Sequence, residues 1–369
     1  MPALITASAV RTCFGTGAET FAALLAGRSG AGPLRHGEPG LLGVKTGYHL
    51  VDGGGSAFKA SRLLADAVGE AVRQAGLDPA RERVAVLVGT GLGELSAVER
   101  WAIDGTPVPP RALDFEGAVR AVLPGAAEVT TLSGACSAGG HVLALAQDLV
   151  ELGEADAVVA AAADTMTRSM LTMIGRVAPV PAAMVRPFDA RREGVLLGEG
   201  AAAAVVVPAT RPGAWPLARL AATGLSCDAG HPTAPDVAGI RRAMQDAYDR
   251  AGRRPADTGL VIAHGTGTAL NDPAECRALR ELGGEPLVTA VKGAVGHTSG
   301  AAVLVNLDVA IRCLHEGLVP PVAGLRTVLD EGAGLRFVVD RPAALPPGPI
   351  QLNAFGFGGV NAVTLLEAA

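Results

Sequence analysis

The feature that most restricts the fold of this chain is an alternation of short apolar runs with segments of helical periodicity. Each run is too short for a helix and is apolar apart from Thr364 in one of them, as expected of a strand that is buried on both faces. Between the runs, apolar residues recur every three or four positions, and three such segments end near a glycine suited to a helix C-terminus. This alternation predicts an α/β architecture. The predicted strands are Val84 to Val88, Ala157 to Ala162, Ala204 to Val207, Leu260 to Ala263 and Ala362 to Leu366, and the predicted helices are Leu63 to Ala75, Val142 to Val150 and Ile240 to Ala251, followed by Gly76, Gly153 and Gly252.

A proline-rich segment, residues 208–216, separates two parts of similar element content. It contains three prolines and one glycine, which interrupt both helices and strands. No direct sequence repetition between the two parts is visible. We expect two domains, an N-terminal half of residues 1–210 and a C-terminal half of residues 211–369.

Charge and cysteine content exclude several classes of function. The net charge is −5 and no run of Lys or Arg occurs, so no nucleic-acid binding is expected. Five widely spaced cysteines without a CxxC pair indicate reduced thiols, and no secretory signal is visible, which predicts a cytoplasmic protein. The most apolar helical segment, Ala301 to Leu314, contains three polar or charged residues and is too short to span a bilayer. No membrane insertion is expected.

Neither a metal site nor a nucleotide site is predicted. Cys227 and His231 have a loosely metal-like spacing, but no second pair of ligands accompanies them. The glycine-rich segment 89–93 follows a predicted strand, yet its spacing is not GxGxxG. Both features are interpreted as structural.

The first candidate functional residue is Cys136, in the stretch TLSGACSAGG between a short predicted strand and a predicted helix. At a helix N-terminus, free N–H groups and the positive end of the helix dipole stabilise a thiolate, which predicts a lowered thiol pKa and a better nucleophile. The alternative is a buried structural cysteine, and this stretch alone does not distinguish the two.

Three further glycine-rich stretches contain residues suited to catalysis. His264 begins HGTGT directly after a predicted strand, where α/β folds place their sites. Lys292 precedes His297 by five residues in a segment with few charges, so the lysine is expected to be partly buried and paired. Phe355 and Phe357 lie in the turn NAFGFGGVN, which can present a backbone N–H to an oxyanion. Each stretch alone has an equally good structural explanation.

Taken together and in this order, the four stretches resemble the motifs of the β-ketoacyl-ACP synthase (ketosynthase) family of the thiolase superfamily. Those motifs are a nucleophilic cysteine, HGTGT, a K-x4-H element and a GFGG turn. The segments 186–191 (RPFDAR), 198–200 (GEG), 228–236 and 24–29 are also similar to that family, so the resemblance covers nearly the whole chain. It implies a five-layered α-β-α-β-α thiolase-like fold of two similar halves, with the cysteine in the first half and both histidines in the second.

The resemblance implies an acyltransferase that performs decarboxylative Claisen condensation in fatty acid or polyketide biosynthesis. Cys136 would accept the acyl group. His264 and His297 would polarise the malonyl thioester carbonyl and assist decarboxylation, while Lys292 would orient His297 and set the local charge. Two neutral imidazoles can donate hydrogen bonds to an enolate oxygen as it forms, which agrees with this chemistry.

The same resemblance assigns the remaining site residues. The backbone N–H groups of Cys136 and Phe357 would form the oxyanion hole, and Phe355 and Phe357 would lie in the turn that gates acyl entry. Thr266 and Thr268 would hydrogen-bond the phosphopantetheine arm of the substrate carrier. No cofactor is expected beyond that arm, which belongs to an acyl carrier protein.

The expected partners are the acyl carrier protein and a second subunit, in either a homodimer or a heterodimer with a ketosynthase-like chain. The carrier is acidic in known relatives, and Arg168 and Arg176 are candidates for contacting it. The apolar residues Met166, Met170, Met173 and Ile174 lie where relatives contribute to the acyl pocket, although core packing explains their spacing equally well.

Three departures from the family pattern stand out. Asn306 occupies the position, nine residues after His297, where many members have a glutamate, so the usual partner of Lys292 is missing. The turn reads GGVN instead of GGTN, and the chain is shorter than typical members. The alternatives are a catalytically silent partner subunit, an acyltransferase that forms no carbon–carbon bond, and a thiolase, although thiolases generally use a second cysteine as base.

Overall fold

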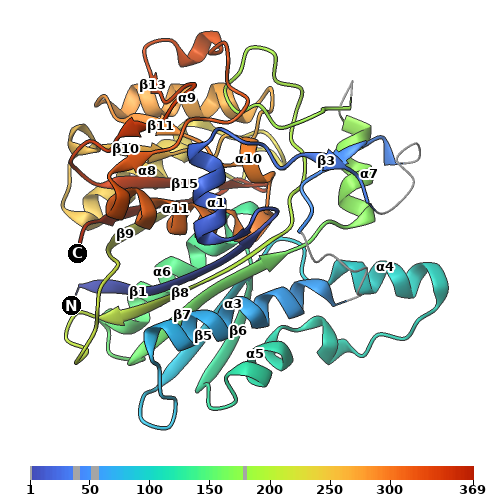
Figure 1. The fold of residues 1–369 in the computed structure, drawn as a ribbon, viewed down its shortest axis with the longest axis vertical. Helices are drawn as coiled ribbons and strands as arrows, with labels where there is room; N and C mark the ends of the chain where they lie inside the picture. The colour runs from blue at the N-terminus through green and yellow to red at the C-terminus, as the bar shows by residue number, and fades with distance from the viewer. Residues whose placement is uncertain (1, 36–41, 51–57, 178–180) are drawn as a thin grey trace.

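The computed structural model describes residues 2–35, 42–50, 58–177 and 181–369 as a mixed α/β structure (Figure 1). All five predicted strands and all three predicted helices are confirmed. The main strands are β1 (Ala3–Thr12), β5 (Val84–Thr90), β6 (Glu128–Ser133), β7 (Ala157–Asp164), β8 (Gly200–Pro208), β9 (Ala218–Cys227), β10 (Leu260–Ile262), β11 (Leu287–Thr289), β15 (Ile350–Gly356) and β16 (Val360–Glu367). The helices are α1 (Gly17–Leu25), α3 (Lys59–Ala75), α4 (Leu95–Asp104), α5 (Glu116–Val122), α6 (Ala138–Glu151), α7 (Arg168–Val177), α8 (Val237–Ala251), α9 (Asn271–Leu282), α10 (Lys292–Val295) and α11 (Ala302–Glu316).

The shorter elements are two-residue strands and 3₁₀ turns. The strands are β2 (Gly15–Thr16), β3 (Gly32–Pro33), β4 (Thr46–Gly47), β12 (Leu318–Val319), β13 (Arg336–Phe337) and β14 (Ala343–Ala344). The 3₁₀ turns are η1 (Pro110–Leu113), η2 (Ala135–Ser137), η3 (Pro255–Asp257), η4 (Ser299–Ala301) and η5 (Asp330–Gly332).

The strand order is the same in the two parts of the chain. It runs β6-β5-β7-β8-β1 in the first part and β11-β10-β15-β16-β9 in the second, which in both is third, second, fourth, fifth and first along the chain. The pattern of parallel and antiparallel neighbours is also the same. β1 and β9 join the two sets of strands through one short antiparallel pairing, Ala3–Ile5 with Ala218–Leu220.

The elements form five layers, as expected. α3 packs on β1, β7 and β8 at one outer face, and α8 packs on β9 and β16 at the other. Between the two sets of strands lie α6 and α11, which contact each other and strands of both parts (Figure 1). We propose a domain division between residues 210 and 211, in the connection from β8 to β9.

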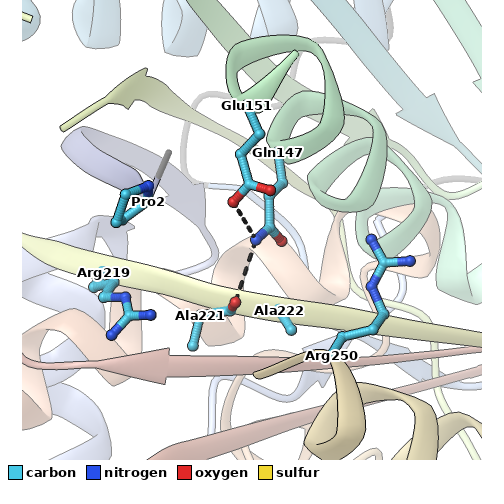
Figure 2. Close-up of a pocket in the computed structure, with 7 residues that line it drawn as sticks. All are labelled: Pro2, Gln147, Glu151, Arg219, Ala221, Ala222 and Arg250. Atoms are coloured by element: carbon cyan, nitrogen blue, oxygen red, sulfur yellow. Dashed lines mark hydrogen bonds between the residues drawn. The ribbon is translucent and has the colours of Figure 1, made fainter. Parts of the chain in front are cut away.

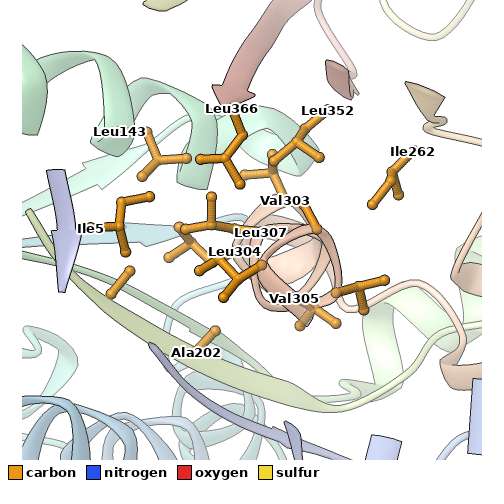
Figure 3. Packing of buried hydrophobic residues seen from close by; sticks show 14 of the residues in the cluster. Ile5, Leu143, Ala202, Ile262, Val303, Leu304, Val305, Leu307, Leu352 and Leu366 are labelled. Atoms are coloured by element: carbon orange, nitrogen blue, oxygen red, sulfur yellow. The ribbon is translucent and has the colours of Figure 1, made fainter. Parts of the chain in front are cut away.

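The largest hydrophobic cluster fills this middle layer. Val303, Leu304 and Leu307 of α11 meet Leu143 of α6 and strand residues of both parts, such as Ile5 (Figure 3). All five side chains are less than 2% exposed. Burial of each contributes about 1.5–3 kcal/mol relative to an exposed position. The starts of α6 and α11 are therefore held firmly with respect to each other.

Glycines end the outer helices as predicted. Gly76 follows α3 and Gly252 follows α8, both in the left-handed conformation, with φ of 59° and 62°. Each donates its N–H back to the last turn of its helix, which is a common way to satisfy free carbonyls at that end. In the described part of the chain, no helix is long and apolar enough to cross a membrane.

Candidate active site

Cys136 is the middle residue of η2, which leads from the end of β6 into α6, so the predicted position at a helix start is confirmed. η4 leads into α11 in the same way. The first residues of the two turns, Ala135 and Ser299, share a positive φ of 48° and 49°, which is uncommon for residues other than glycine. The turns are in contact, and their middle residues, Cys136 and Gly300, occupy equivalent positions in the two halves.

The predicted lowering of the Cys136 pKa is wrong. Burial and, to a smaller extent, the charge of Asp164 raise the pKa of this thiol to about 11, although the charge of Lys292 and the backbone N–H groups of Phe357 and Cys136 act in the opposite direction. Loss of solvation therefore outweighs the helix N-terminus. The thiol is protonated at neutral pH, and the same N–H groups can hold a negative charge that forms beside the sulfur.

The two histidines predicted to act together lie side by side. The ring centroids of His264 and His297 are 5.5 Å apart with the rings nearly perpendicular, and both residues are buried. His264 Nδ1 accepts the N–H of Phe355 at 3.4 Å, and His297 Nδ1 accepts the N–H of Ser299 at 3.3 Å. Burial and the charge of Lys292 lower the pKa of both imidazoles well below the usual value. Each ring is therefore neutral and carries its proton on Nε2.

Lys292 is confirmed as a buried residue, but its hydrogen bonds differ from the prediction. Its Nζ donates to the carbonyl oxygen of His264 and lies 3.3 Å from His264 Nδ1. Lys292 therefore positions His264, whereas His297 is positioned by the N–H of Ser299. Burial lowers the pKa of Lys292 to about 8 against the raising effect of Glu275, Cys136 and Asp272. The ammonium is still the main form at neutral pH.

Two carboxylates that were given no role in the sequence analysis hold the HGTGT loop in place. Glu275 accepts the N–H groups of His264 at 2.7 Å and Gly265 at 2.9 Å, and Asn353 Nδ2 at 2.8 Å. Asp272 accepts the N–H of Thr266 at 3.0 Å. Neither side chain is exposed. The available sequence signal was two acidic residues three positions apart at a helix start, directly after a loop with free N–H groups.

Glu275 supplies a negative charge that acts on Lys292, although position 306 carries no glutamate. Asn306 is buried in α11. The largest opposing charge on Lys292 comes instead from Glu275, which lies on α9. The usual glutamate is absent at position 306, as expected, and the charge of Glu275 acts on Lys292 from a different helix.

The predicted threonines and phenylalanines surround this centre. The Thr266 and Thr268 hydroxyls are 2.9 Å apart, and Thr268 also accepts the N–H of Asn271. The ring of Phe355 is buried with its centroid 5.5 Å from that of His264. Phe357 is 46% exposed, while its backbone N–H acts to lower the pKa of the Cys136 thiol. One phenylalanine thus faces the imidazole and the other faces solvent.

The residues predicted in and just before α7 divide into exposed and packed positions. Arg168 and Arg176 are exposed at the two ends of the helix, and Met173 is 37% exposed. The others join a hydrophobic cluster around Tyr48, which favours core packing over acyl contact. The packed residues are Met166, Met170 and Ile174.

A cavity of about 400 Å³ lies at the opposite end of α6 from Cys136 (Figure 2). Gln147 and Glu151 line it from the last turns of that helix, about 16 Å along its axis from the cysteine. The cavity is therefore separate from the centre described above. The remaining lining residues are Pro2, Arg219, Ala221, Ala222 and Arg250.

Chemically, the centre combines a thiol, two neutral N–H donors and a buried ammonium. Such a set can accept an acyl group on sulfur and stabilise negative charge that develops on an oxygen. In the described ranges, no group of three or more His, Cys, Asp or Glu side chains could hold a metal ion.

Comparison with known proteins identifies the family. Residues 57–211 match the β-ketoacyl synthase N-terminal domain and residues 217–326 match the β-ketoacyl synthase C-terminal domain. Nodulation protein E of Rhizobium meliloti (strain 1021) is 34% identical over 372 residues, covering 91% of both chains. 3-oxoacyl-[acyl-carrier-protein] synthase 2 of Coxiella burnetii (strain RSA 493 / Nine Mile phase I) is 27% identical over 387 residues, covering 94% of this chain and 93% of that protein.

The fold agrees with these sequence matches. The solved structure of the ishigamide ketosynthase/chain length factor superposes with a TM-score of 0.90 at 30% identity, covering 100% of this chain and 99% of that chain. The shared architecture is the thiolase fold. On its sequence matches and its fold, this chain belongs to the β-ketoacyl synthase family of the thiolase superfamily.

Proposed function

We propose that the protein catalyses decarboxylative Claisen condensation between an acyl group on Cys136 and a malonyl unit on an acyl carrier protein. The observation that carries this proposal is the pair of buried, neutral imidazoles of His264 and His297, each with Nδ1 occupied and its proton on Nε2. Two such donors suit an enolate, which develops a full negative charge on one oxygen.

The first step is transfer of the acyl group to the cysteine. The sulfur of Cys136 attacks the thioester of the acyl carrier, and the carrier's phosphopantetheine sulfur leaves. Because burial keeps the Cys136 thiol protonated, its proton passes to the departing sulfur, which balances the exchange. The N–H groups of Cys136 and Phe357 form the oxyanion hole for the tetrahedral intermediate.

The second step breaks the bond between the malonyl carboxylate and its neighbouring carbon. Carbon dioxide leaves, and the electron pair of the broken bond forms an enolate whose oxygen accepts the Nε2–H groups of His264 and His297. The ammonium of Lys292 stabilises this charge through His264, with which it shares hydrogen bonds.

In the third step, the enolate carbon attacks the acyl group on Cys136. Collapse of the intermediate releases the thiolate and leaves a β-ketoacyl chain on the carrier. Thr266 and Thr268, at the edge of the HGTGT loop, hydrogen-bond the phosphopantetheine arm, and Phe355 and Phe357 lie at the acyl entrance.

The proposed partners are an acyl carrier protein and a second ketosynthase-like subunit. The name of the Coxiella relative includes the acyl carrier protein, and the ishigamide structure is described as a ketosynthase with a chain length factor. Arg168 and Arg176 are exposed cations available to an acidic carrier. The pathway makes fatty acids or polyketides, and the phosphopantetheine arm supplies the only prosthetic group required.

Three measurements on the same reaction test the proposal. The protein is mixed with acyl carrier protein bearing an acyl group and with malonyl carrier protein. Intact-mass spectrometry detects the acyl group on Cys136, trapping measures carbon dioxide, and product analysis detects β-ketoacyl carrier. Cys136→Ala is expected to abolish acylation and product. The matched control, Cys313→Ala, removes a buried thiol from α11 and is expected to retain both.

The alternatives give different results in the same assay. A catalytically silent partner subunit leaves Cys136 unacylated. An acyltransferase that forms no carbon–carbon bond acylates Cys136 but releases no carbon dioxide from malonyl carrier. Either result contradicts the proposed condensation.

A further inference from the structure

A buried carboxylate that takes no part in the chemistry described above lies where the two halves meet. Asp164 is the last residue of β7 and is 1% exposed. Burial raises the pKa of Asp164 to about 6 despite four hydrogen bonds from N–H and O–H donors. Removing a carboxylate from water costs free energy, so this position calls for a specific role.

The four donors come from both halves of the molecule. Oδ1 accepts the hydroxyl of Thr90 at 2.7 Å and the N–H of Leu92 at 2.9 Å, while Oδ2 accepts the N–H of Gly91 at 2.8 Å. Thr90 is the last residue of β5, and Gly91 and Leu92 begin the loop that follows it in the N-terminal half. The fourth donor is the N–H of Gly300 in η4, at 2.6 Å from Oδ2.

η4 connects this carboxylate to a proposed catalytic ring. Gly300 follows Ser299, whose positive φ of 49° is unfavourable for a serine. In that conformation Ser299 directs its N–H to Nδ1 of His297 at 3.3 Å. The bond from Gly300 to Asp164 holds the turn that presents this N–H. The chain of contacts therefore runs from Asp164 through Gly300 and Ser299 to His297.

The loop held by Asp164 also contacts the turn that carries the cysteine. A Cβ atom on Gly91 would lie 3.2 Å from the carbonyl oxygen of Ala135, and a Cβ atom on Gly300 would lie 2.7 Å from the backbone nitrogen of Gly91. Backbone atoms of the loop are thus packed directly against η2 and η4. Movement of the loop would change the spacing of the two turns.

We infer that Asp164 is a positioning residue that fixes the Nε2–H tautomer of His297 and the placement of η4 against η2. The inference rests on the proposed function, because it assigns Asp164 to the decarboxylation step in which His297 donates its proton. Asp164 touches no reacting atom and acts through Gly300 and Ser299.

Two variants of Asp164 remove its hydrogen-bond acceptors to different extents. Asp164→Ala removes every acceptor, and Asp164→Asn keeps one amide oxygen. We expect decarboxylation of malonyl carrier to fall roughly 10²-fold in Asp164→Ala, with partial recovery in Asp164→Asn. Acylation of Cys136 is expected to fall less than about tenfold, since that step does not use the His297 proton.

The decisive readout is ¹⁵N NMR of the imidazoles, which reports the tautomer without any turnover. His297 is expected to be in the Nε2–H form in the unaltered protein and to become a mixture of tautomers in both variants. This measurement, together with the alkylation rate of Cys136, remains informative even if the protein proves not to condense acyl groups. Failure of the inference is therefore distinguishable from failure of the proposed function.

Asp308→Ala is the matched control. Asp308 is also a buried aspartate and accepts bonds from Ser8 at 2.8 Å and Arg312 at 2.7 Å, but it lies further along α11. It is expected to lower thermal stability and leave both the tautomer and the ratio of decarboxylation to acylation unchanged. The inference is overturned if the His297 tautomer is unchanged in an Asp164 variant that folds. It is also overturned if decarboxylation and acylation fall by the same factor.

Discussion

At the scale of single residues, the chemistry depends on how burial changes protonation. Lys292 keeps its proton at neutral pH while His264 and His297 are neutral, because the lysine starts from a much higher pKa and all three are buried. One cation and two neutral donors therefore occupy a small volume. The motifs pointed to three residues that the structure brings together, but spacing alone could not show that Lys292 bonds to His264 rather than to His297.

Replacing the lysine tests this arrangement. Lys292→Met keeps the length of the side chain and removes the charge and the hydrogen bonds to His264. Decarboxylation of malonyl carrier is expected to fall by roughly 10²-fold, since the enolate loses its nearest cation. Stopped-flow or trapped carbon dioxide measures the rate. A variant that decarboxylates as fast as the unaltered protein would contradict the role of the ammonium.

The rate of decarboxylation should also fall as the pH rises. The pKa of Lys292 is about 8, below its ordinary 10.5, so decarboxylation is expected to decline as pH rises through 8. In that window the folded protein binds fewer protons than the unfolded chain, and the contribution of Lys292 to stability therefore rises with pH. Initial rates across about pH 6 to 10 test this. Persistence of the same decline in Lys292→Met would assign it to another group.

At the scale of secondary-structure elements, α9 holds the HGTGT loop through two carboxylates. Glu275 and Asp272 accept the backbone N–H groups that the loop cannot pair within itself. Of these elements, β10 was predicted from its local run of apolar residues, whereas α9 was not predicted. The bonds between α9 and the loop could not be predicted either, because they depend on how the chain folds back after β10.

Glu275→Gln is expected to destabilise the protein by about 1–3 kcal/mol. The amide of glutamine would place an NH₂ group against the N–H of His264 or Gly265, which leaves a buried donor unsatisfied. Chemical denaturation measures the change. The control is Glu281→Gln on the same helix, where an exposed pair with Arg241 is lost and the effect is expected to be within about 0.5 kcal/mol. Equal effects in the two variants would contradict the stated role of Glu275.

At the scale of the whole molecule, the two halves repeat one strand order around a shared middle layer. The division into halves was expected from the linker and from the family resemblance, but the repeated order was not visible in the sequence. The reason is that the repeat lies in the path of the backbone, whereas the residues that fill equivalent positions differ. The raised pKa of Cys136 was missed for a related reason, since its burial depends on contacts from the other half.

The close packing of α6 against α11 can be tested by substituting a glycine between them. A Cβ atom on Gly139 would lie 2.7 Å from Val303 Cγ1 and 2.8 Å from the carbonyl oxygen of Gly300. Gly139→Ala is therefore expected to cost about 1–3 kcal/mol and to reduce condensation by moving η2 away from η4. The control is Gly117→Ala in α5, which has open space around it and is expected to gain about 0.5–1 kcal/mol. A neutral Gly139→Ala would contradict the close packing.

Because Cys136 and Gly300 occupy equivalent positions, the structure explains why only one of the two turns carries a cysteine. A side chain at Gly300 would collide with backbone atoms of Gly91 and Thr90 and with Asp164, so the second copy of the turn cannot carry a nucleophile. The two halves therefore share an architecture but carry different residues at this equivalent turn. In the proposed function, the turn with Cys136 would hold the acyl group, and the turn with Gly300 would position the imidazole of His297.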